Sequence, residues 1–331
     1  MVRAAIIGLG RWGRSLVNAV HGKTGAIRFV AAHSRTRTSA EDFLNGKNIP
    51  LADSYEAILA DKSIDAVVLA TPHSQHADQV IAATRAGKHI HCEKPLTLDL
   101  ASATAAVDAA KKAGLVLAVG FNRRFDPSFR EVKERVAKGE VGILRSVRIT
   151  SRDPQPPPAS YLEVSGGMFK DMTIHDLDQA RFQLGEIVEV SAVASDNGLQ
   201  LFKEAKDHAQ AIVTMRAASG ALATIVNSRA CAYGYDQRLE LFGDAGSLEA
   251  GNWTATTVRA ANATQTDAAG PILNFFLERY MPAFKAEFDE FVQAIKADRA
   301  PAVGFADGRA ALVLAEAANE SVATGRVVKL G

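Results

Sequence analysis

The chain has 331 residues, of which 47% are hydrophobic and 23% charged, and its formal net charge at pH 7 is +1. This length suffices for two domains with separate cores, and the balanced charge gives no reason to expect a nucleic acid or a membrane surface as partner. Two cysteines, Cys92 and Cys231, show no metal-ligand spacing, so we expect a reduced, cytoplasmic protein. No apolar run approaches the ~18 residues of a membrane helix, and the interrupted run near the N-terminus does not read as a signal peptide.

The first third of the chain alternates short apolar runs with helical patterns. The apolar runs predict strands at 2–7, 27–32, 64–70, 89–92 and 116–121. Helical periodicity lies between them, at 11–20, 39–44, 54–60, 75–86 and 100–112. Because such alternation is typical of a parallel sheet covered on both faces, we expect an α/β fold with a doubly wound parallel sheet in residues 1–121.

The pattern changes after residue 121. A helix is predicted over 127–138, followed by a strand at 144–151 and a proline-rich loop. Further patterns predict a helix over 170–184, strands at 188–194, 210–216, 222–228 and 237–242, and helices at 283–296 and 307–323. Since no regular helix separates the last three strands, we expect residues 122–331 to form an α+β domain with a large, open, mostly antiparallel sheet.

A glycine-rich loop follows the first predicted strand and opens a helix. Its glycines have the G-x-G-x-x-G spacing, which is informative only in this strand–loop–helix context. Gly8 permits the tight turn, Gly10 lets the backbone approach a pyrophosphate, and Gly13 lets the helix pack close to the strand. A Rossmann dinucleotide site is therefore favoured over a plain glycine turn. The predicted cofactor loop comprises Gly8, Leu9, Gly10, Arg11, Trp12 and Gly13.

The end of the second predicted strand bears on the choice of dinucleotide. An NAD-preferring site usually has an acidic residue here to bind the ribose 2′-hydroxyl, but this chain has Ser34, with Arg35 and Arg37 close by. Guanidinium groups suit a 2′-phosphate by charge and by their forked geometry. NADP is therefore favoured as cofactor, while NAD remains possible if the two arginines are only solvated surface residues.

Two polar segments follow the third and fourth predicted strands, where open α/β sheets bind ligands. The first contains Thr71, Pro72 and His76, and the second contains Glu93 and Lys94. We expect all five residues to contribute to cofactor binding. Lys94 is also a candidate for catalysis, because a nearby oxidised nicotinamide would ease loss of its proton and its amine can hydrogen-bond a reacting oxygen. Taken alone, a lysine after a strand is usually a surface residue.

The second domain contributes an acid–histidine pair. Asp171 and His175 are four residues apart on a predicted helix and so share one face, with Asp178 a turn further along. A carboxylate beside an imidazole orients it and raises its basicity, as a general base requires. The alternative is a helix with a satisfied histidine and a solvated acidic face. No set of histidines and acids has convincing ligand spacing, so we predict no metal.

Taken together, these residues resemble the glucose–fructose oxidoreductase / inositol 2-dehydrogenase (Gfo/Idh/MocA) family over nearly the whole chain. The resemblance lies in the glycine loop, Thr71-Pro72 with His76, Glu93-Lys94-Pro95, the segment 120–126 and the helix of Asp171 and His175. The Ser151–Pro154 segment and its following prolines, and the segment 233–236, look most like bacterial inositol 2-dehydrogenases. One departure is Ser34, where many NAD-dependent inositol dehydrogenases have an aspartate.

This resemblance implies a function and an assembly. It implies hydride transfer between nicotinamide and a secondary hydroxyl or ketone of a cyclic polyol or sugar, with a homodimer or homotetramer formed through the sheet of the second domain. In it, the counterpart of His175 takes the hydroxyl proton, that of Asp171 tunes the histidine, and that of Lys94 holds the reacting oxygen. The substrate-binding residues we predict are Lys94, Arg123, Asp153, Asp171, His175, Asp178 and Tyr235.

Two other functions remain open at this point. A nucleotide-sensing regulator would keep the fold without chemistry, since a fold does not determine a function, although Lys94, Asp171 and His175 are all retained. A glycoside hydrolase that uses NAD as a transient oxidant also occurs in the family. Arg123, Arg124 and Arg152 further leave open a carboxylated substrate, unless they are ion-pair partners.

Overall fold

The computed structural model describes all 331 residues, and the chain forms two compact units. The first comprises Met1–Phe125 and Met281–Val313, and the second comprises Asp126–Tyr280 and Leu314–Gly331. The division near residue 125 lies close to the predicted boundary at 121/122. The structure corrects the predicted extent of the second domain, because Met281–Val313 returns to the first unit. The reason is packing: Phe288, Phe291 and Val292 are buried in the same apolar core as the parallel strands.

The first unit contains a five-stranded parallel sheet in the order β2-β1-β3-β4-β5. Its strands are β1 (Val2–Ile7), β2 (Ile27–His33), β3 (Ala66–Leu69), β4 (His89–Cys92) and β5 (Leu117–Val119). Every residue of β3 and β5 is buried, which explains their uninterrupted apolar sequences. The strand order reverses at β1, so the carboxyl ends of β1 and β3 flank the switch point where such sheets bind ligands.

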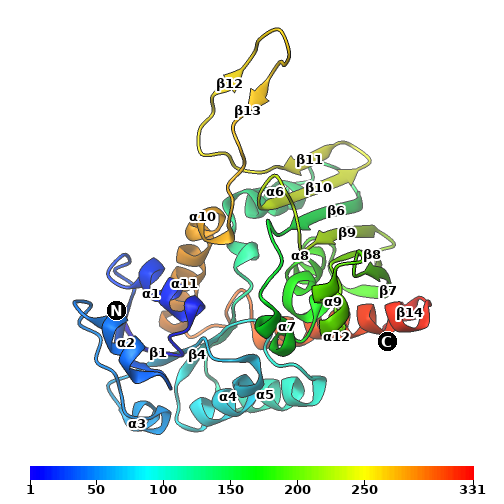
Figure 1. The fold of residues 1–331 in the computed structure, drawn as a ribbon. Helices are drawn as coiled ribbons and strands as arrows, with labels where there is room; N and C mark the ends of the chain where they lie inside the picture. The colour runs from blue at the N-terminus through cyan, green and yellow to red at the C-terminus, as the bar shows by residue number, and fades with distance from the viewer. The chain divides into compact units, whose positions relative to one another are not determined.

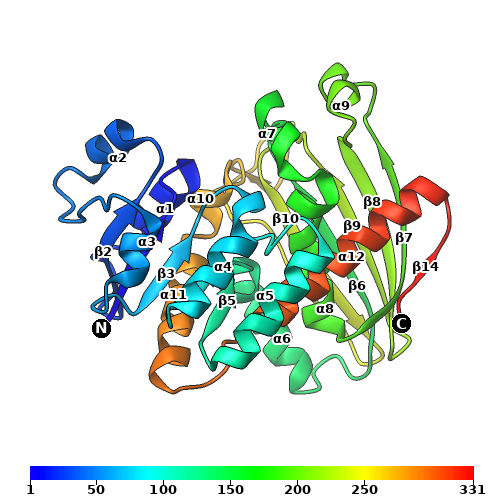
Figure 2. The same cartoon turned by 90° about the horizontal axis from the view of Figure 1, so that it is seen from below.

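Helices cover both faces of this sheet. α1 (Arg11–Val20) and α11 (Met281–Lys296) pack on one face and share its core. α4 (His76–Arg85) and α5 (Leu100–Ala113) lie side by side on the other (Figure 2). The remaining helical elements of the unit are α2 (Arg37–Leu44), α3 (Tyr55–Ala60) and the 3-10 turns η1 (His73–Gln75) and η2 (Asn122–Phe125). The predicted doubly wound Rossmann sheet is confirmed.

The second unit contains a seven-stranded sheet in the order β11-β10-β6-β9-β8-β7-β14. All neighbours are antiparallel except β6 and β9, which are parallel. The strands are β6 (Leu144–Arg152), β7 (Ile187–Ser195), β8 (Gln210–Ala217), β9 (Leu222–Ser228), β10 (Asp236–Gly243), β11 (Ser247–Ala250) and β14 (Val328–Lys329). The predicted large, mostly antiparallel sheet is confirmed.

One face of this sheet packs against helices and the other is open. Strict alternation of buried and exposed residues along β8 places every second side chain in the core. α6 (Pro127–Ala137), α8 (Ile174–Leu184) and the second half of α12 (Phe305–Thr324) complete that core, and Figure 2 shows α8 and α12 against the sheet. The exposed apolar side chains on the strands of the opposite face are Val193, Ile212, Leu222 and Phe242.

Several short elements were not predicted. They are α7 (Ala159–Ser165), α9 (Gln200–Ala205), α10 (Phe276–Arg279) and a hairpin of β12 (Arg259–Ala260) and β13 (Ala268–Ala269) that extends beyond β11 in Figure 1. Elements this short have no sequence periodicity by which to recognise them. None of the helices is long and apolar enough to cross a membrane.

Candidate functional site

The glycine loop has the geometry that its three glycines require. Gly8 has a φ of +95°, and a Cβ added there would lie 2.5 Å from the carbonyl oxygen of Ala70. A Cβ on Gly13 would lie 1.9 Å from the carbonyl oxygen of Gly8, so only glycine lets α1 begin this close to the strand. Around Gly10 nothing lies within 4 Å of an added Cβ, which leaves its backbone open to an approaching ligand. The loop thus fits a dinucleotide pyrophosphate at the start of α1.

The residues after β2 are placed differently from one another. Arg37 begins α2 and pairs with Asp53 at 3.2 Å and with Glu41 at 3.6 Å. Two carboxylates therefore already offset its charge. Arg35 is exposed and forms no ion pair, and Ser34 is half-buried. Of the two arginines predicted to meet a 2′-phosphate, Arg35 is the one whose charge is not already paired.

His76 joins the two segments that follow β3 and β4. Its ring is completely buried, with Nδ1 2.9 Å from the carbonyl oxygen of Pro95 and Nε2 3.0 Å from that of Thr71. Burial lowers the pKa of His76, while the contacts with the backbone carbonyls of Pro95 and Thr71 oppose the fall. With both nitrogens directed at the backbone, His76 supports the segments containing Thr71 and Lys94 rather than presenting a donor to a ligand.

Lys94 is the one residue between Ile90 and Thr97 that is not buried. The preceding Glu93 points into the protein, and a Cβ on Gly120 would lie 2.8 Å from its Oε2. Burial raises the pKa of the Glu93 carboxyl to about 7, although nearby positive groups, Lys94 among them, oppose the rise. The amine of Lys94 therefore lies in the electrostatic field of a buried carboxyl that titrates near neutral pH.

A second buried pair lies behind Glu93. His91 and Glu287 are 3.6 Å apart, both almost without exposure, and the His91 ring stacks on Phe288 with centroids 4.6 Å apart. Burial lowers the pKa of His91, but the Glu287 carboxylate more than offsets this and the pKa is raised. Burial raises the pKa of Glu287 in turn. Neither residue is recognisable as functional from sequence, because their partnership joins β4 to the distant helix α11.

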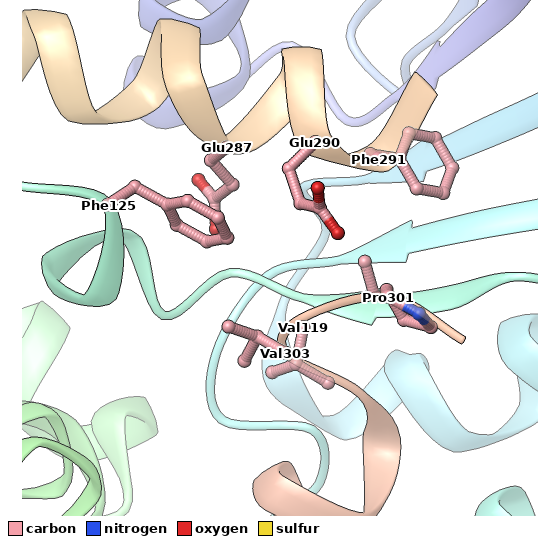
Figure 3. A pocket seen from close by; sticks show the side chains of 8 residues that line it. Val119, Phe125, Glu287, Glu290, Phe291, Pro301 and Val303 are labelled. Atoms are coloured by element: carbon pink, nitrogen blue, oxygen red, sulfur yellow. The ribbon is translucent and has the colours of Figure 1, made fainter. Parts of the chain in front are cut away.

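A small cavity opens beside this pair. Its volume is about 10 Å³, the size of one water molecule, and it is lined by apolar groups of β5 and the 301–303 segment and by two glutamates of α11. Figure 3 shows Glu287 and Glu290 pointing from α11 toward Val119 and Val303. The cavity is too small for a substrate, and it belongs to the buried ionisable cluster rather than to a binding cleft.

The arginines that left open a carboxylated substrate have partners. Arg124 in η2 pairs with Asp307 at 3.1 Å, and Arg152 at the end of β6 pairs with Asp236 at 3.0 Å. Arg123 is buried, with only 5% of its surface exposed. Arg124 and Arg152 thus act as ion-pair partners within their own units.

In the second unit, a π-helical turn precedes the helix that was predicted over 170–184. Residues Phe169–Thr173 form this turn and α8 follows directly from Ile174. Such turns are rare and occur frequently at functional sites. Asp171 lies within the turn, where its Oδ1 accepts a hydrogen bond of 2.7 Å from the Tyr161 hydroxyl and its Oδ2 one of 3.4 Å from Arg229. Both oxygens of the carboxylate are therefore fixed.

His175 is the one residue from Asp171 to Ala180 that is not buried. The two aspartates that follow it point inward: Asp176 accepts a 2.8 Å hydrogen bond from the Asn227 amide, and Asp178 is 1% exposed. The alternative of a solvated acidic face does not apply to Asp176 and Asp178, because both side chains are buried. His175 is thus the half-buried residue of this segment, with its Nδ1 buried.

The other residues predicted to touch substrate lie at the ends of strands. Asp153 follows β6, where its backbone N–H donates to the Ser228 carbonyl at 2.9 Å. Tyr235 precedes β10, is 6% exposed and packs edge-on against Tyr280 with ring centroids 6.0 Å apart.

The site residues divide between the two units. The first contains the glycine loop, the residues after β2, Glu93 and Lys94, while the second contains Asp153, Asp171, His175, Asp178 and Tyr235. The structure brings Asp171 together with Tyr161 and Arg229, which sequence analysis missed because buried arginines and short helices leave no local pattern. It contains no group of three or more histidine, cysteine or acidic side chains that could hold a metal.

Comparison with known proteins identifies the family. Residues 2–121 match the profile described as an oxidoreductase family with an NAD-binding Rossmann fold, and residues 129–249 match the Gfo/Idh/MocA C-terminal domain. The chain belongs to the Gfo/Idh/MocA oxidoreductase family. The resemblance inferred from the sequence motifs is confirmed.

Similar proteins cover the full length of this family member. It is 41% identical to a myo-inositol 2-dehydrogenase of Thermotoga maritima, over 99% of this chain and 98% of the relative. A myo-inositol dehydrogenase structure from Corynebacterium glutamicum aligns with a TM-score of 0.95 and 42% identity, over 100% of this chain and 99% of that one. A scyllo-inositol dehydrogenase structure from Lactobacillus casei, with bound NAD(H) and scyllo-inositol, aligns with a TM-score of 0.90 and 27% identity, over 99% of both chains.

Proposed function

We propose that this protein is an NAD(P)-dependent dehydrogenase that oxidises a secondary hydroxyl of a cyclic polyol of the inositol type, or reduces the matching ketone. The observation on which the proposal rests is that Lys94 and His175 are the partly exposed residues of otherwise buried segments. The full-length similarity to inositol dehydrogenases supports the same substrate class. Because only these side chains of the two segments reach the surface, they are the groups available to a reacting hydroxyl.

Each residue has a distinct part in the proposed reaction. Bound NAD(P)⁺ would supply the hydride acceptor. His175 takes the hydroxyl proton as general base, and Asp171, fixed by Tyr161 and Arg229, stabilises the imidazolium that results. Lys94 donates a hydrogen bond to the reacting oxygen and restrains its position.

The proposed substrate and cofactor contacts follow from the same segments. Arg123, Asp153, Asp178 and Tyr235 are proposed to bind substrate. Asp153 is half-buried and the other three are buried, which would restrict them to a closely fitting ligand. The glycine loop residues, with Thr71, Pro72, Glu93 and Lys94, are proposed to surround the cofactor. His76 contributes to cofactor binding indirectly, by holding the Thr71 and Pro95 carbonyls.

Of the two nicotinamide cofactors, NADP is proposed as the preferred one. The exposed, unpaired guanidinium of Arg35 lies beside the neutral Ser34 at the end of β2. Arg35→Ala should then weaken NADPH binding by about tenfold, roughly 1.4 kcal/mol, while leaving NADH binding within twofold. Arg37→Ala is the matched control, since Asp53 and Glu41 already pair with that arginine. Tighter binding of NADH than of NADPH by the wild type would overturn the preference.

Absorbance of reduced nicotinamide tests the proposed reaction. The wild type is mixed with NAD⁺ or NADP⁺ and a panel of inositols and aldoses, and net reduction of the cofactor is expected. Lys94→Met and His175→Ala should each abolish turnover while cofactor affinity stays within threefold, whereas Lys62→Met at an exposed position should remain active. Glycoside cleavage without net reduction, or tight cofactor binding without any turnover, would refute the assignment.

A homodimer or homotetramer through the open face of the seven-stranded sheet is proposed as the assembly. The pairing register places Val193 beside Ile212 and Ile212 beside Val226, so that apolar side chains form a row across three strands. Such a continuous apolar row suits a self-complementary contact with a second copy. Ile212→Glu should reduce the molar mass measured by light scattering, whereas Ile143→Glu, exposed outside the sheet, should not. An unchanged mass in Ile212→Glu would exclude this face.

The proposed compartment is the cytoplasm. Cys92 and Cys231 are both buried as free thiols, a state that a reducing environment preserves.

A further inference from the structure

Arg229 is a fully buried arginine in the second unit that the proposed reaction does not use directly. It follows β9 and is 1% exposed, and its backbone N–H donates to the Ala209 carbonyl at 2.7 Å. A guanidinium cannot lose its charge in a protein, so burial requires that carboxylates face it.

Two carboxylates, from different parts of the chain, face this one cation. Nη1 of Arg229 lies 3.4 Å from Oδ2 of Asp171, and Nη2 lies 3.6 Å from Oδ2 of Asp207. Both acids are buried, Asp207 with 8% of its surface exposed. One positive charge is therefore divided between two negative ones in a region with little water to screen them.

Asp207 also fixes the backbone that leads into the π-helical turn. Its Oδ1 accepts a 2.9 Å hydrogen bond from the N–H of Met168, and a Cβ added to Gly167, where φ is +85°, would lie 3.4 Å from the same oxygen. The two acids are thus linked twice, through the guanidinium of Arg229 and through the backbone that joins residue 168 to Asp171.

We propose that Arg229 and Asp207 are positioning residues that set the orientation and the effective charge of Asp171, and through it the basicity of His175. The inference rests on the proposed function, in which Asp171 stabilises the His175 imidazolium. The positive charge of Arg229 offsets part of the negative charge of Asp171 that acts on the histidine. Asp207 weakens this offset, because it shares the same guanidinium. The Tyr161 hydroxyl also donates to Asp171, and the charge of Asp153 acts on the same hydroxyl and raises its pKa.

Removal of Asp207 and removal of Arg229 should then change the basicity of His175 in opposite directions. In Asp207→Asn the guanidinium serves Asp171 alone, so the potential at His175 becomes less negative and its imidazolium less stable. In Arg229→Gln two carboxylates remain without their cation, so the potential becomes more negative and the imidazolium more stable. Loss of a merely structural contact would lower stability in both variants without this change of sign.

The test is the acidic limb of the pH profile of kcat/KM, together with an NMR titration of His175, identified by comparison with His175→Gln. Asp207→Asn should shift both to lower pH and Arg229→Gln should shift both to higher pH, by about half a unit or more in each case. Arg229→Lys, which restores the charge, should bring the profile back toward wild type. Arg135→Gln, which removes an exposed arginine of α6 from its pair with Glu140, should leave it unchanged.

The outcomes separate this inference from the proposed function. Absence of cofactor reduction by the wild type would refute the dehydrogenase, while the NMR titration would still report on Arg229 and Asp207. If Arg229→Gln fails to fold, Asp207→Asn provides the test. A shift of the His175 titration midpoint to lower pH supports the inference, and an unchanged or raised midpoint overturns it.

Discussion

The buried carboxyl of Glu93 makes the stability of the first unit depend on pH. Its pKa is about 7 in the folded protein against an ordinary 4.5, because burial disfavours the charged form. Between these two values the folded state holds a proton that the unfolded chain has released. Stability should therefore fall as pH rises from about 4.5 to about 7 and should level off above that range. At ~1.4 kcal/mol per pKa unit, this loss amounts to roughly 3 kcal/mol.

Glu93→Gln should remove most of this slope. Glutamine has the shape of the protonated carboxyl, so the variant should match the wild type near pH 4.5 and exceed its stability at pH 8 by up to roughly 3 kcal/mol. The raised pKa values of His91 and Glu287 act in the same direction, because each group also holds its proton to a higher pH when folded. A slope of the same sign from that pair should therefore persist in the variant.

Urea denaturation at several pH values between 4.5 and 8 measures this effect. Trp12 lies close enough to interact with the Glu93 carboxyl, so its fluorescence in a Trp253→Phe background reports on the first unit. Glu134→Gln, at an exposed position of α6, serves as the matched control. If the free energy of unfolding of the wild type did not change across this pH range, or if Glu93→Gln kept its full pH dependence, the assignment of the buried proton to Glu93 would be wrong.

Three further predictions concern the backbone and the core. Gly13→Ala should weaken NAD(P)H binding at least tenfold in a fluorescence titration, because its Cβ would overlap the Gly8 carbonyl at 1.9 Å. His76→Gln should lower kcat by about tenfold or more in steady-state assays, with a smaller change in cofactor affinity, since the two carbonyls it joins would shift. Asp126→Ala should cost about 3–5 kcal/mol in urea denaturation, because it leaves the charge of Arg279 buried without its partner.

The features that could be predicted from sequence are those encoded in neighbouring residues. Strands β3 and β5 are short, uninterrupted apolar runs, and Gly8 and Gly13 of the first loop occupy positions where a side chain would meet backbone. The half-buried Lys94 and His175 were selected by chemistry and motif, and each is flanked by buried residues in the structure.

Features that depend on distant parts of the chain could not be predicted. α11 has an apolar face that any core could have accepted, and only the fold shows that Phe288 packs with the first unit. Arg229 meets Asp171 across 58 residues of sequence, and Asp207 approaches from a different loop. A solvated face was the open alternative for the acids of the His175 helix, but Asp176 and Asp178 are buried and Asn227 donates to Asp176, a partner that the spacing cannot reveal.

The buried carboxyl of Glu93 and the Asp171–Arg229–Asp207 cluster should have opposite effects on the enzyme activity as the pH rises. Deprotonation of His175 raises the rate as pH increases, while ionisation of Glu93 lowers the stability of the first unit over the range up to about pH 7. In a long assay, the rise in rate and the loss of stability would combine. The resulting apparent pH optimum would then correspond to the pKa of neither group. Initial rates after brief and prolonged incubation at each pH separate them: Glu93→Gln should reduce the pH-dependent loss on incubation, and Asp207→Asn should shift the acidic limb of the initial rate to lower pH.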